Sequence, residues 1–228
     1  MSQPATVVAV DGPSASGKST ISRMVAQRLG FNYVDSGAMY RAVTWKAIEA
    51  GLDVNDTEQV IALLHRVKIH FDIVDREARM FVDGVFPGNA VREPRVAGKV
   101  SIVAAIPEVR RVLVAQQRAL TEFGSLVMEG RDIGSVVFPH TPHKFYIDAN
   151  PEERAKRRQK DFAAMQIAAS TGDVAQALAQ RDKLDSSRAV APLQVALGAI
   201  VVDNSRNTAE QTVQVILDRI EETREKSE

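Results

Sequence analysis

The chain has 228 residues, with 29 basic and 29 acidic side chains and no cysteine. A formal net charge of zero argues against a protein that binds nucleic acid or a membrane surface through charge. The absence of cysteine excludes disulfides, thiolate catalysis and thiolate metal sites. The composition is that of an ordinary globular protein, so the function must be inferred from motifs.

The segment from Met1 to Pro4 carries no basic residue, and the apolar run behind it ends at Asp11. The longest later apolar stretch, residues 195–202, is far shorter than the ~20 residues that a membrane helix needs. We therefore expect a cytoplasmic protein, and we expect no nucleic-acid or membrane partner.

Four short apolar runs rich in β-branched residues predict strands, at residues 6–10, 125–128, 144–148 and 199–202. Helical patterns follow at 18–29, after Asn150 and from about 208 to 222. Asn150 with Pro151 and Glu153 is typical of a helix start, and Thr208 with Gln211 resembles a capping box. Strands that alternate with helices predict an α/β fold, a three-layer α/β/α sandwich around a parallel sheet.

The middle of the chain follows a different pattern. Residues 68–73 and 79–83 alternate apolar and polar side chains around a polar turn, which predicts an antiparallel hairpin. Helical patterns flank it near 58–67 and at about 107–123. We therefore expect residues 37–124 to form an insertion, with a small antiparallel β element, between two strands of the main sheet.

Residues 12–19 match the phosphate-binding pattern G-x-x-x-x-G-K-[ST] at every defined position. The loop consists of Gly12, Pro13, Ser14, Ala15, Ser16, Gly17, Lys18 and Ser19, followed by Thr20. Glycines let backbone N–H groups turn toward phosphate oxygens, Lys18 would reach the β- and γ-phosphates, and the Ser19 hydroxyl would bind Mg²⁺. A strand before the loop and a helix after it are the context the motif requires, so we expect a purine nucleoside triphosphate site.

Such a loop occurs in GTPase switches, motor ATPases and small-molecule kinases, so a second anion site must discriminate among them. Residues 35–41 are typical of a helix start, where N–H groups and Arg41 could hold an anion. Arg131 follows a predicted core strand, at the edge of the sheet where ligands of α/β proteins bind.

Two further groups of arginines lie at helical spacing. Arg154, Arg157 and Arg158 would share one face of a helix, as would Arg181, Asp185 and Arg188 if that segment is helical. A solvated amphipathic face is the alternative for the first group. The other interpretation is a mobile lid, residues 151–188, that closes over phosphates and excludes water.

Four motifs together resemble those of the bacterial cytidylate kinases. They are Asp-Gly-Pro-Ser-Ala-Ser-Gly-Lys-Ser-Thr (11–20), Asp-Ser-Gly-Ala-Met-Tyr-Arg (35–41), Glu-Gly-Arg-Asp-Ile-Gly-Ser-Val-Val-Phe-Pro (129–139) and Arg-Asp-x-x-Asp-x-x-Arg-x-x-x-Pro-Leu (181–193). The resemblance runs from about Val7 to the C-terminal helix. It implies transfer of a phosphoryl group from Mg·ATP to CMP or dCMP, in pyrimidine nucleotide metabolism.

The resemblance also implies roles for individual residues. The acceptor phosphate or its neighbourhood would be contacted by Ser36, Arg41, Arg131 and Arg188. The cytosine edge would be bound by Ser101, Arg110 and Asp132, and the ribose hydroxyls by Arg181 and Asp185. We place Arg157 with the ATP-binding residues of the loop, and we expect Lys18, Arg131, Asp185 and Arg188 to act in the transfer itself.

Three domains are implied: a core of residues 1–36, 125–150 and 189–228, a nucleoside-monophosphate-binding domain of residues 37–124, and a lid of residues 151–188.

Either Ser19 or Thr20 could bind the Mg²⁺ that accompanies ATP, and the general pattern favours Ser19. Glu129 is either an outer-sphere acid for that ion or a strand-end charge that orients Arg131. We expect a monomer.

Two other functions stay open at this point. A kinase of the same architecture could act on UMP, AMP or a metabolite hydroxyl, and a hydroxyl acceptor would need a base such as Asp35. A nucleotide-dependent switch would need a guanine-binding motif and an apolar partner surface, and neither is evident. The acceptor phosphate of a nucleotide is already ionised, so the favoured function needs no general base.

Overall fold

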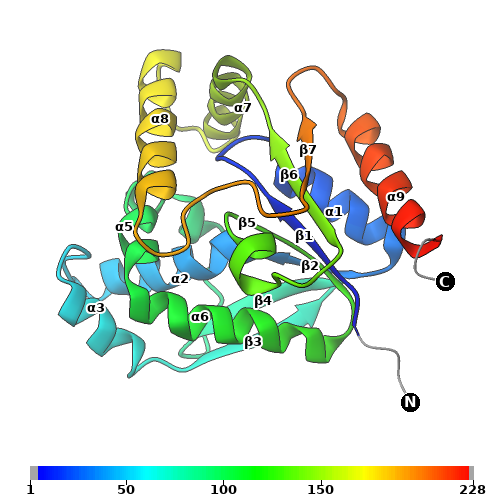
Figure 1. Ribbon diagram of the computed structural model, residues 1–228. Coiled ribbons are helices and arrows are strands. Elements are labelled where there is room, and N and C mark those ends of the chain that lie inside the picture. The colour runs from blue at the N-terminus through cyan, green and yellow to red at the C-terminus, as the bar shows by residue number, and fades with distance from the viewer. Residues whose placement is uncertain (1–4, 226–228) are drawn as a thin grey trace.

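The computed structural model describes residues 5–225, and Figure 1 shows them as a twisted sheet with helices on both faces. Residues 1–4 and 226–228, which include the N-terminal segment and both ends of the predicted core domain, lie outside the described residues. Within the described chain the sheet has seven strands in the order β3-β4-β2-β5-β1-β6-β7. Their bounds are β1 Val7–Asp11, β2 Asn32–Asp35, β3 Ile69–Val74, β4 Glu77–Val82, β5 Leu126–Gly130, β6 His143–Asp148 and β7 Ile200–Asp203.

The centre of the sheet is parallel, as predicted. Strand β1 lies between β5 and β6, with Ala9 opposite Met128 on one side and Lys144 on the other. Strand β2 pairs with β5, and β7 pairs with β6, also in parallel. All these strands therefore end at one edge of the sheet, where their C-terminal residues can form a site. The predicted α/β/α sandwich is confirmed.

The predicted hairpin is confirmed as β3 and β4, which pair from Ile69 opposite Val82 to Val74 opposite Glu77. It does not form a separate element, however. Strand β4 continues the core sheet by lying parallel to β2, with Tyr33 opposite Glu77. Strand β2 was not predicted, because its four residues carry only Tyr33 and Val34 as apolar signal.

The helices follow the predicted boundaries closely outside the segment 84–106. Their bounds are α1 Lys18–Leu29, α2 Ser36–Glu49, α3 Thr57–Leu64, η1 Gly88–Arg92, α4 Pro94–Ala97, α5 Val100–Ala105, α6 Pro107–Ala119, η2 Leu120–Phe123, η3 Ile133–Val137, α7 Pro151–Ala164, α8 Thr171–Ser187 and α9 Ala209–Glu225. Here η1 and η2 are short 3₁₀ segments and η3 is a π-helical turn. No periodic pattern in 84–106 is long enough to predict η1, α4 and α5.

Both predicted helix starts are confirmed by their hydrogen bonds. The Asn150 side chain accepts the N–H of Glu153 at 2.9 Å, with Pro151 in the first turn of α7. At the start of α9, Gln211 accepts the N–H of Thr208 at 2.8 Å, and the Thr208 hydroxyl accepts the N–H of Gln211 at 3.2 Å. These local bonds satisfy N–H groups that have no partner inside the helix.

Alternate residues of β1 face opposite layers of the molecule. Val8 and Val10 pack with buried residues of α1 and α9, whereas Val7 and Ala9 pack with Leu120 and the η3 turn. This period of two is the geometry of a strand covered on both faces. Figure 1 shows α1 and α9 together on one side of the sheet and α6 on the other.

Two further hydrophobic clusters are centred in the insertion and in the lid. The insertion cluster runs from Met39 to Leu113, and the lid cluster joins Ala155, Val174 and Leu178 of the paired helices α7 and α8. The division into core, insertion and lid stays a prediction. Among the described helices, none is long and apolar enough to cross a bilayer.

Candidate active site

A pocket of about 530 Å³ lies at the C-terminal edge of the parallel strands, between the insertion and the lid. Most of the residues predicted for the site line it: Ser14, Ala15, Gly17, Lys18, Ser19, Thr20, Ser36, Arg41, Ser101, Arg110, Arg131, Asp132, Arg157, Arg181, Asp185 and Arg188. Gly12, Pro13 and Ser16 are not among the lining residues and form the back of the phosphate loop. Residues far apart in the chain are thus brought to one cavity.

The phosphate loop depends on glycine at its first position. Gly12 has a φ of 150°, and a Cβ there would lie 2.1 Å from the carbonyl oxygen of Ile147. Only glycine allows strand β6 to pass this close. At the other end of the loop, the Lys18 ammonium donates to the carbonyl of Pro13 at 2.8 Å, within the loop itself.

Lys18 is held in a strongly cationic setting. The pKa of Lys18 is lowered to about 7, mainly by burial and next by the nearby charge of Arg131, which outweighs the opposing effect of Glu129. A cation in such surroundings is stabilised when an anion enters. The pocket around Lys18 is therefore suited to phosphate groups.

The side chain of Asn204 supports the loop from behind, a role that sequence reasoning missed. Its amide donates to the carbonyl of Ser16 at 2.8 Å, and its own carbonyl oxygen accepts the Thr212 hydroxyl at 2.8 Å. Asn204 directly follows β7, and β7 lies two strands from β1 in the sheet. The position of this polar residue just after a predicted strand was the signal that could have identified it.

All three arginines on the face of α7 contact the phosphate loop. Arg154 donates to the carbonyl of Ser14 at 3.3 Å, and Arg157 donates to the carbonyl of Ser16 at 2.9 Å. Arg158 donates to the Ser14 hydroxyl at 3.0 Å. The alternative of a solvated amphipathic face is therefore wrong for this helix.

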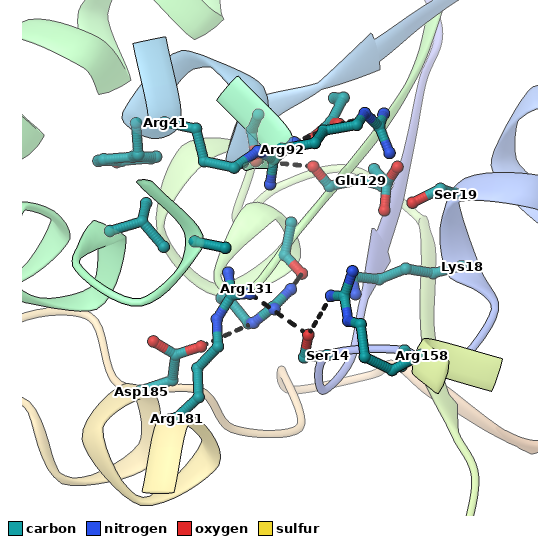
Figure 2. A pocket seen from close by; sticks show the side chains of 18 of the residues that line it. Ser14, Lys18, Ser19, Arg41, Arg92, Glu129, Arg131, Arg158, Arg181 and Asp185 are labelled. Atoms are coloured by element: carbon teal, nitrogen blue, oxygen red, sulfur yellow. Dashed lines mark hydrogen bonds and ion pairs between the residues drawn. The ribbon is translucent and has the colours of Figure 1, made fainter. Parts of the chain in front are cut away.

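A fourth lid arginine, Arg181 of α8, reaches the same hydroxyl of Ser14 at 3.4 Å. Figure 2 shows Arg158 and Arg181 approaching Ser14 from different helices, with Arg131 and Lys18 beside them. The pKa of Arg181 is lowered to about 9, mainly by burial and next by the charge of Arg131. Like Lys18, this guanidinium lacks a full complement of negative partners.

The acceptor side begins at the N-terminus of α2. Asp35 caps this helix by accepting the N–H of Ala38 at 2.8 Å, and it pairs with Arg41 at 2.7 Å. Arg92 of η1 also approaches Asp35, at 3.6 Å. Burial alone would raise the pKa of Asp35, but the two guanidiniums outweigh it and hold the pKa below its usual value. Sequence reasoning missed Arg92 because it lies in the segment without a periodic pattern.

Glu129, near the buried end of β5, contacts the neighbouring strand β2 and the start of α2. Its carboxylate accepts the Tyr33 hydroxyl, and its backbone carbonyl accepts the Ser36 hydroxyl at 2.6 Å. Burial, followed by the charge of Glu129, raises the pKa of Tyr33 well above its ordinary value. The carboxylate also lines the pocket across from Lys18, as Figure 2 shows.

The far end of the pocket contains a buried ion pair between Arg110 of α6 and Asp132. Arg188 lies 3.7 Å from the same carboxylate. Burial raises the pKa of Asp132, and the positive charges of Arg110 and Arg188 oppose that rise. Arg188 is the residue that ends α8, after Ser187, and it lines the same pocket as Arg181 and Asp185.

Asp185 joins three parts of the site. One carboxylate oxygen accepts the Ser101 hydroxyl at 2.8 Å, and the other accepts Nε of Arg131 at 2.9 Å. Although burial opposes it, Arg131 and Arg181 lower the pKa of Asp185. The lid helix α8 is thus tied to α5 and to the loop after β5 through a single ionised side chain.

The residues present suit a magnesium ion that is bound mainly by phosphates and water. Within residues 5–225, no group of three or more His, Asp or Glu could hold a metal ion. The hydroxyls of Ser19 and Thr20 both line the pocket close to Lys18, and Glu129 faces them. One hydroxyl ligand with phosphate oxygens and water is the donor set that Mg²⁺ accepts beside a nucleotide.

A family model and two curated relatives that match this chain all carry the name cytidylate kinase. The profile of the cytidylate kinase family matches residues 8–222. Cytidylate kinase from Caldanaerobacter subterraneus subsp. tengcongensis is 38% identical over 213 residues, which cover 93% of this chain and 93% of that protein. Cytidylate kinase from Limosilactobacillus fermentum is 43% identical over 217 residues, which cover 95% and 96% respectively.

Among solved structures, shikimate kinase from Acinetobacter baumannii aligns with a TM-score of 0.46 at 14% identity, over 96% of this chain and 94% of that chain. The assignment rests on the sequence matches, which span nearly the whole chain and both sides of the pocket. The chain therefore belongs to the cytidylate kinase family.

Proposed function

We propose that this protein transfers the γ-phosphoryl group of Mg·ATP to CMP and dCMP, giving ADP and CDP or dCDP. The observation that supports it most is one cavity that joins a phosphate loop, at Lys18, to the buried pair of Arg110 and Asp132. Arginines from the core, the insertion and the lid line the space between. We also propose that the protein is a monomer and acts in the cytoplasm.

The donor triphosphate would lie along the phosphate loop. Its oxygens would accept hydrogen bonds from the loop N–H groups and from Lys18, at the N-terminus of α1. Ser19, with Thr20 as the alternative, would bind the Mg²⁺, which neutralises phosphate charge when it is bound. Arg157 would lie beside this nucleotide, since it already donates to the loop carbonyl of Ser16.

The acceptor phosphate would lie between Arg41, Arg131 and Arg188. One of its oxygens attacks the γ-phosphorus of ATP, a new P–O bond forms, and the bond to the β-phosphate oxygen breaks so that ADP leaves. The attacking oxygen is already ionised, so the chain needs no general base. Lys18 and the arginines stabilise the charge that spreads over the transferring group.

The pair of Arg110 and Asp132 would select the base. Asp132 accepts a hydrogen bond from the exocyclic amine of cytosine, and Arg110 donates to the ring acceptors. Uracil presents the opposite pattern at this position and would place its carbonyl oxygen against the Asp132 carboxylate, where neither group can donate a hydrogen bond, which lowers the rate with UMP. The ribose would lie against Arg181 and Asp185, at the point where the lid meets α5.

A hydroxyl acceptor is disfavoured by the state of Asp35, the residue that would have to remove the proton. Its pKa lies below the usual value because Arg41 and Arg92 stabilise the charged form. A carboxylate that is so well paired is a weak base. The arginines around it suit a phosphate better than an alcohol.

The test is to mix the pure protein with Mg·ATP and one of CMP, dCMP, UMP, AMP or no acceptor, and to follow both products by chromatography. Rapid formation of CDP and dCDP alone, with matching ADP, is the expected result. Equal turnover of UMP would contradict the proposed role of Arg110 and Asp132. ADP release that ignores all four acceptors would contradict the proposed function altogether.

A further inference from the structure

Asp11, the last residue of β1, is buried and uses both carboxylate oxygens to hold a distant loop. One oxygen accepts the N–H of Ile133 at 2.8 Å, and the other accepts the N–H of Gly134 at 2.8 Å. These N–H groups are the first two of the η3 turn. The phosphate-loop pattern begins one residue later, so the pattern itself assigns no role to Asp11.

The two ends of this bridge lie next to the two halves of the pocket. Gly12 follows Asp11 and opens the phosphate loop, whereas Asp132 precedes Ile133 and pairs with Arg110. A single side chain therefore links the loop that would hold ATP to the loop that would hold the acceptor. The backbone of Asp11 is itself fixed in the sheet, because Asp11 lies opposite Gly130 of β5 on one side and Tyr146 of β6 on the other.

The bridge also replaces a cap that the turn would otherwise take from its own residue. Asp132 stands at the N-cap position of η3, where an aspartate normally accepts N–H groups of the first turn. Its side chain makes no such bond and faces Arg110 and Arg188 instead. Because Asp11 satisfies these N–H groups, the carboxylate of Asp132 is free to line the pocket.

Gly134 lies against neighbouring side chains with little free space. A Cβ at this position would lie 3.3 Å from the Lys144 side chain and 3.4 Å from Ala196. Ile133 is fully buried in the sheet cluster below. The turn is thus packed on three sides, and Asp11 supplies the polar contact on the fourth.

We propose that Asp11 is a positioning residue for the acceptor: it holds Arg131 and Asp132 at a defined place relative to the phosphate loop. This inference rests on the proposed function, because it takes Arg131 and Asp132 as acceptor ligands. Asp11 is not among the residues that line the pocket. Its effect is to keep the acceptor oxygen in line with the γ-phosphorus, where small displacements cost large factors in rate.

The charge state of Asp11 is consistent with this role. The pKa of Asp11 is raised to about 6, mainly by burial and to a smaller extent by Asp132, although the N–H groups of Gly134 and Ile133 and the charge of Arg131 lower it. At neutral pH the group is still ionised, so both oxygens remain acceptors. An amide in its place would offer one acceptor and would turn its own N–H₂ toward the second N–H.

The test compares Asp11→Asn with the wild type in the free protein and in turnover. In hydrogen–deuterium exchange, the peptide that contains Ile133 and Gly134 should exchange faster in the variant, because one N–H loses its partner. In kinetics, KM for CMP should rise about tenfold and kcat should fall about tenfold, while KM for ATP stays within about twofold. KM does not depend on the fraction of folded enzyme, so a loss of stability alone would leave both KM values unchanged.

Asp53→Asn is the matched control, since Asp53 also accepts a backbone N–H, that of Asn55 at 3.0 Å, but on an exposed loop away from the pocket. It should leave exchange at residues 133–134 and all kinetic constants unchanged. Asp11→Ser, which is smaller and keeps one acceptor oxygen, should show the same selective rise in the KM for CMP. Unchanged exchange, or equal rises in the KM for CMP and for ATP, would overturn the inference. A wild type that phosphorylates no nucleotide would refute the proposed function instead, and the exchange experiment would still decide whether Asp11 holds the turn.

Discussion

The side-chain amide of Asn204 donates a hydrogen bond of 2.8 Å to the carbonyl of Ser16, although 188 positions separate them in the chain. Arg157 donates to the same carbonyl at 2.9 Å and to the carbonyl of Asn204 at 2.6 Å. A Cβ on Gly17 would lie 2.5 Å from the Asn204 amide. The turn after β7 is therefore a structural support for the phosphate loop.

Replacing Asn204 by alanine should weaken ATP binding. The variant loses the bond to Ser16 and leaves the buried Thr212 hydroxyl without its acceptor, so we expect the KM for ATP to rise about tenfold and the free energy of unfolding to fall by about 1–3 kcal/mol. Steady-state kinetics and thermal unfolding measure the two effects. Asn207→Ala is the control, because Asn207 lies on the same turn, is exposed and bonds only to the carbonyl of Asp203 among the described contacts. A normal KM for ATP in Asn204→Ala would contradict this role.

The binding of Mg·ATP should be coupled to proton uptake. In the free protein the pKa of Lys18 is about 7, because burial and Arg131 disfavour its charge. Phosphate oxygens favour the charged form and raise that pKa, so at about pH 8 binding should take up close to one proton, and affinity should fall as the pH rises above 7. Calorimetry in buffers of different ionisation enthalpy measures this uptake. At about pH 6, where Lys18 is already protonated, the same experiment should detect almost none. Equal uptake at both pH values would show that another group is responsible.

Arg110 and Arg111 provide a matched pair of variants for base selection. Arg110 is buried against Asp132, whereas Arg111 is exposed and pairs with Glu108 at 2.6 Å. Arg110→Met should lower kcat/KM for CMP by at least about a hundredfold, since a buried charged hydrogen bond is lost. The ratio of kcat/KM for CMP to kcat/KM for UMP should also become smaller. Arg111→Met should change neither kcat/KM for CMP nor the preference for CMP over UMP. An unaltered preference for CMP in Arg110→Met would place base selection elsewhere. Thermal unfolding is measured in parallel, because a buried Asp132 without its partner also destabilises the fold.

Gly130 should tolerate no side chain. A Cβ there would lie 2.5 Å from the Ser36 hydroxyl and 2.6 Å from Cδ1 of Ile133, so Gly130→Ala must displace both. We expect a loss of about 1–3 kcal/mol of stability and a severe loss of activity with CMP. Gly172→Ala is the control, since the only heavy atom near its Cβ, the Ser170 hydroxyl, is 3.8 Å away. That variant should be active and slightly more stable, because alanine favours a helix. An active, stable Gly130→Ala would show that the loop after β5 is more mobile than its packing indicates.

The features that the sequence predicted well are local. The phosphate loop needs glycines and a lysine at defined spacing, and the starts of α7 and α9 depend on side chains within three residues of the bonds they make. The hairpin depends on a short alternation around one turn. Such features are encoded by neighbouring residues, so a single sequence suffices to identify them.

The features that it did not predict depend on contacts across the fold. Strand β2 is identified by its partners β5 and β4 rather than by its own few apolar residues. Arg92 lies in a segment whose three short helices are ordered by packing on the insertion cluster. Asn204 and Asp11 act on residues more than a hundred positions away. The candidate site residues came largely from the family resemblance, and their individual roles stay predictions.

The molecule is built from separate apolar clusters that meet at a pocket edged by arginines and carboxylates. If α8 separates from α5, as the predicted lid would, Asp185 loses a hydrogen bond from Ser101 and an ion pair with Arg131, and water can replace both. Each hydrogen bond to a charged group contributes only about 1.5–3 kcal/mol net. Asp185 would therefore hold the lid closed without locking it.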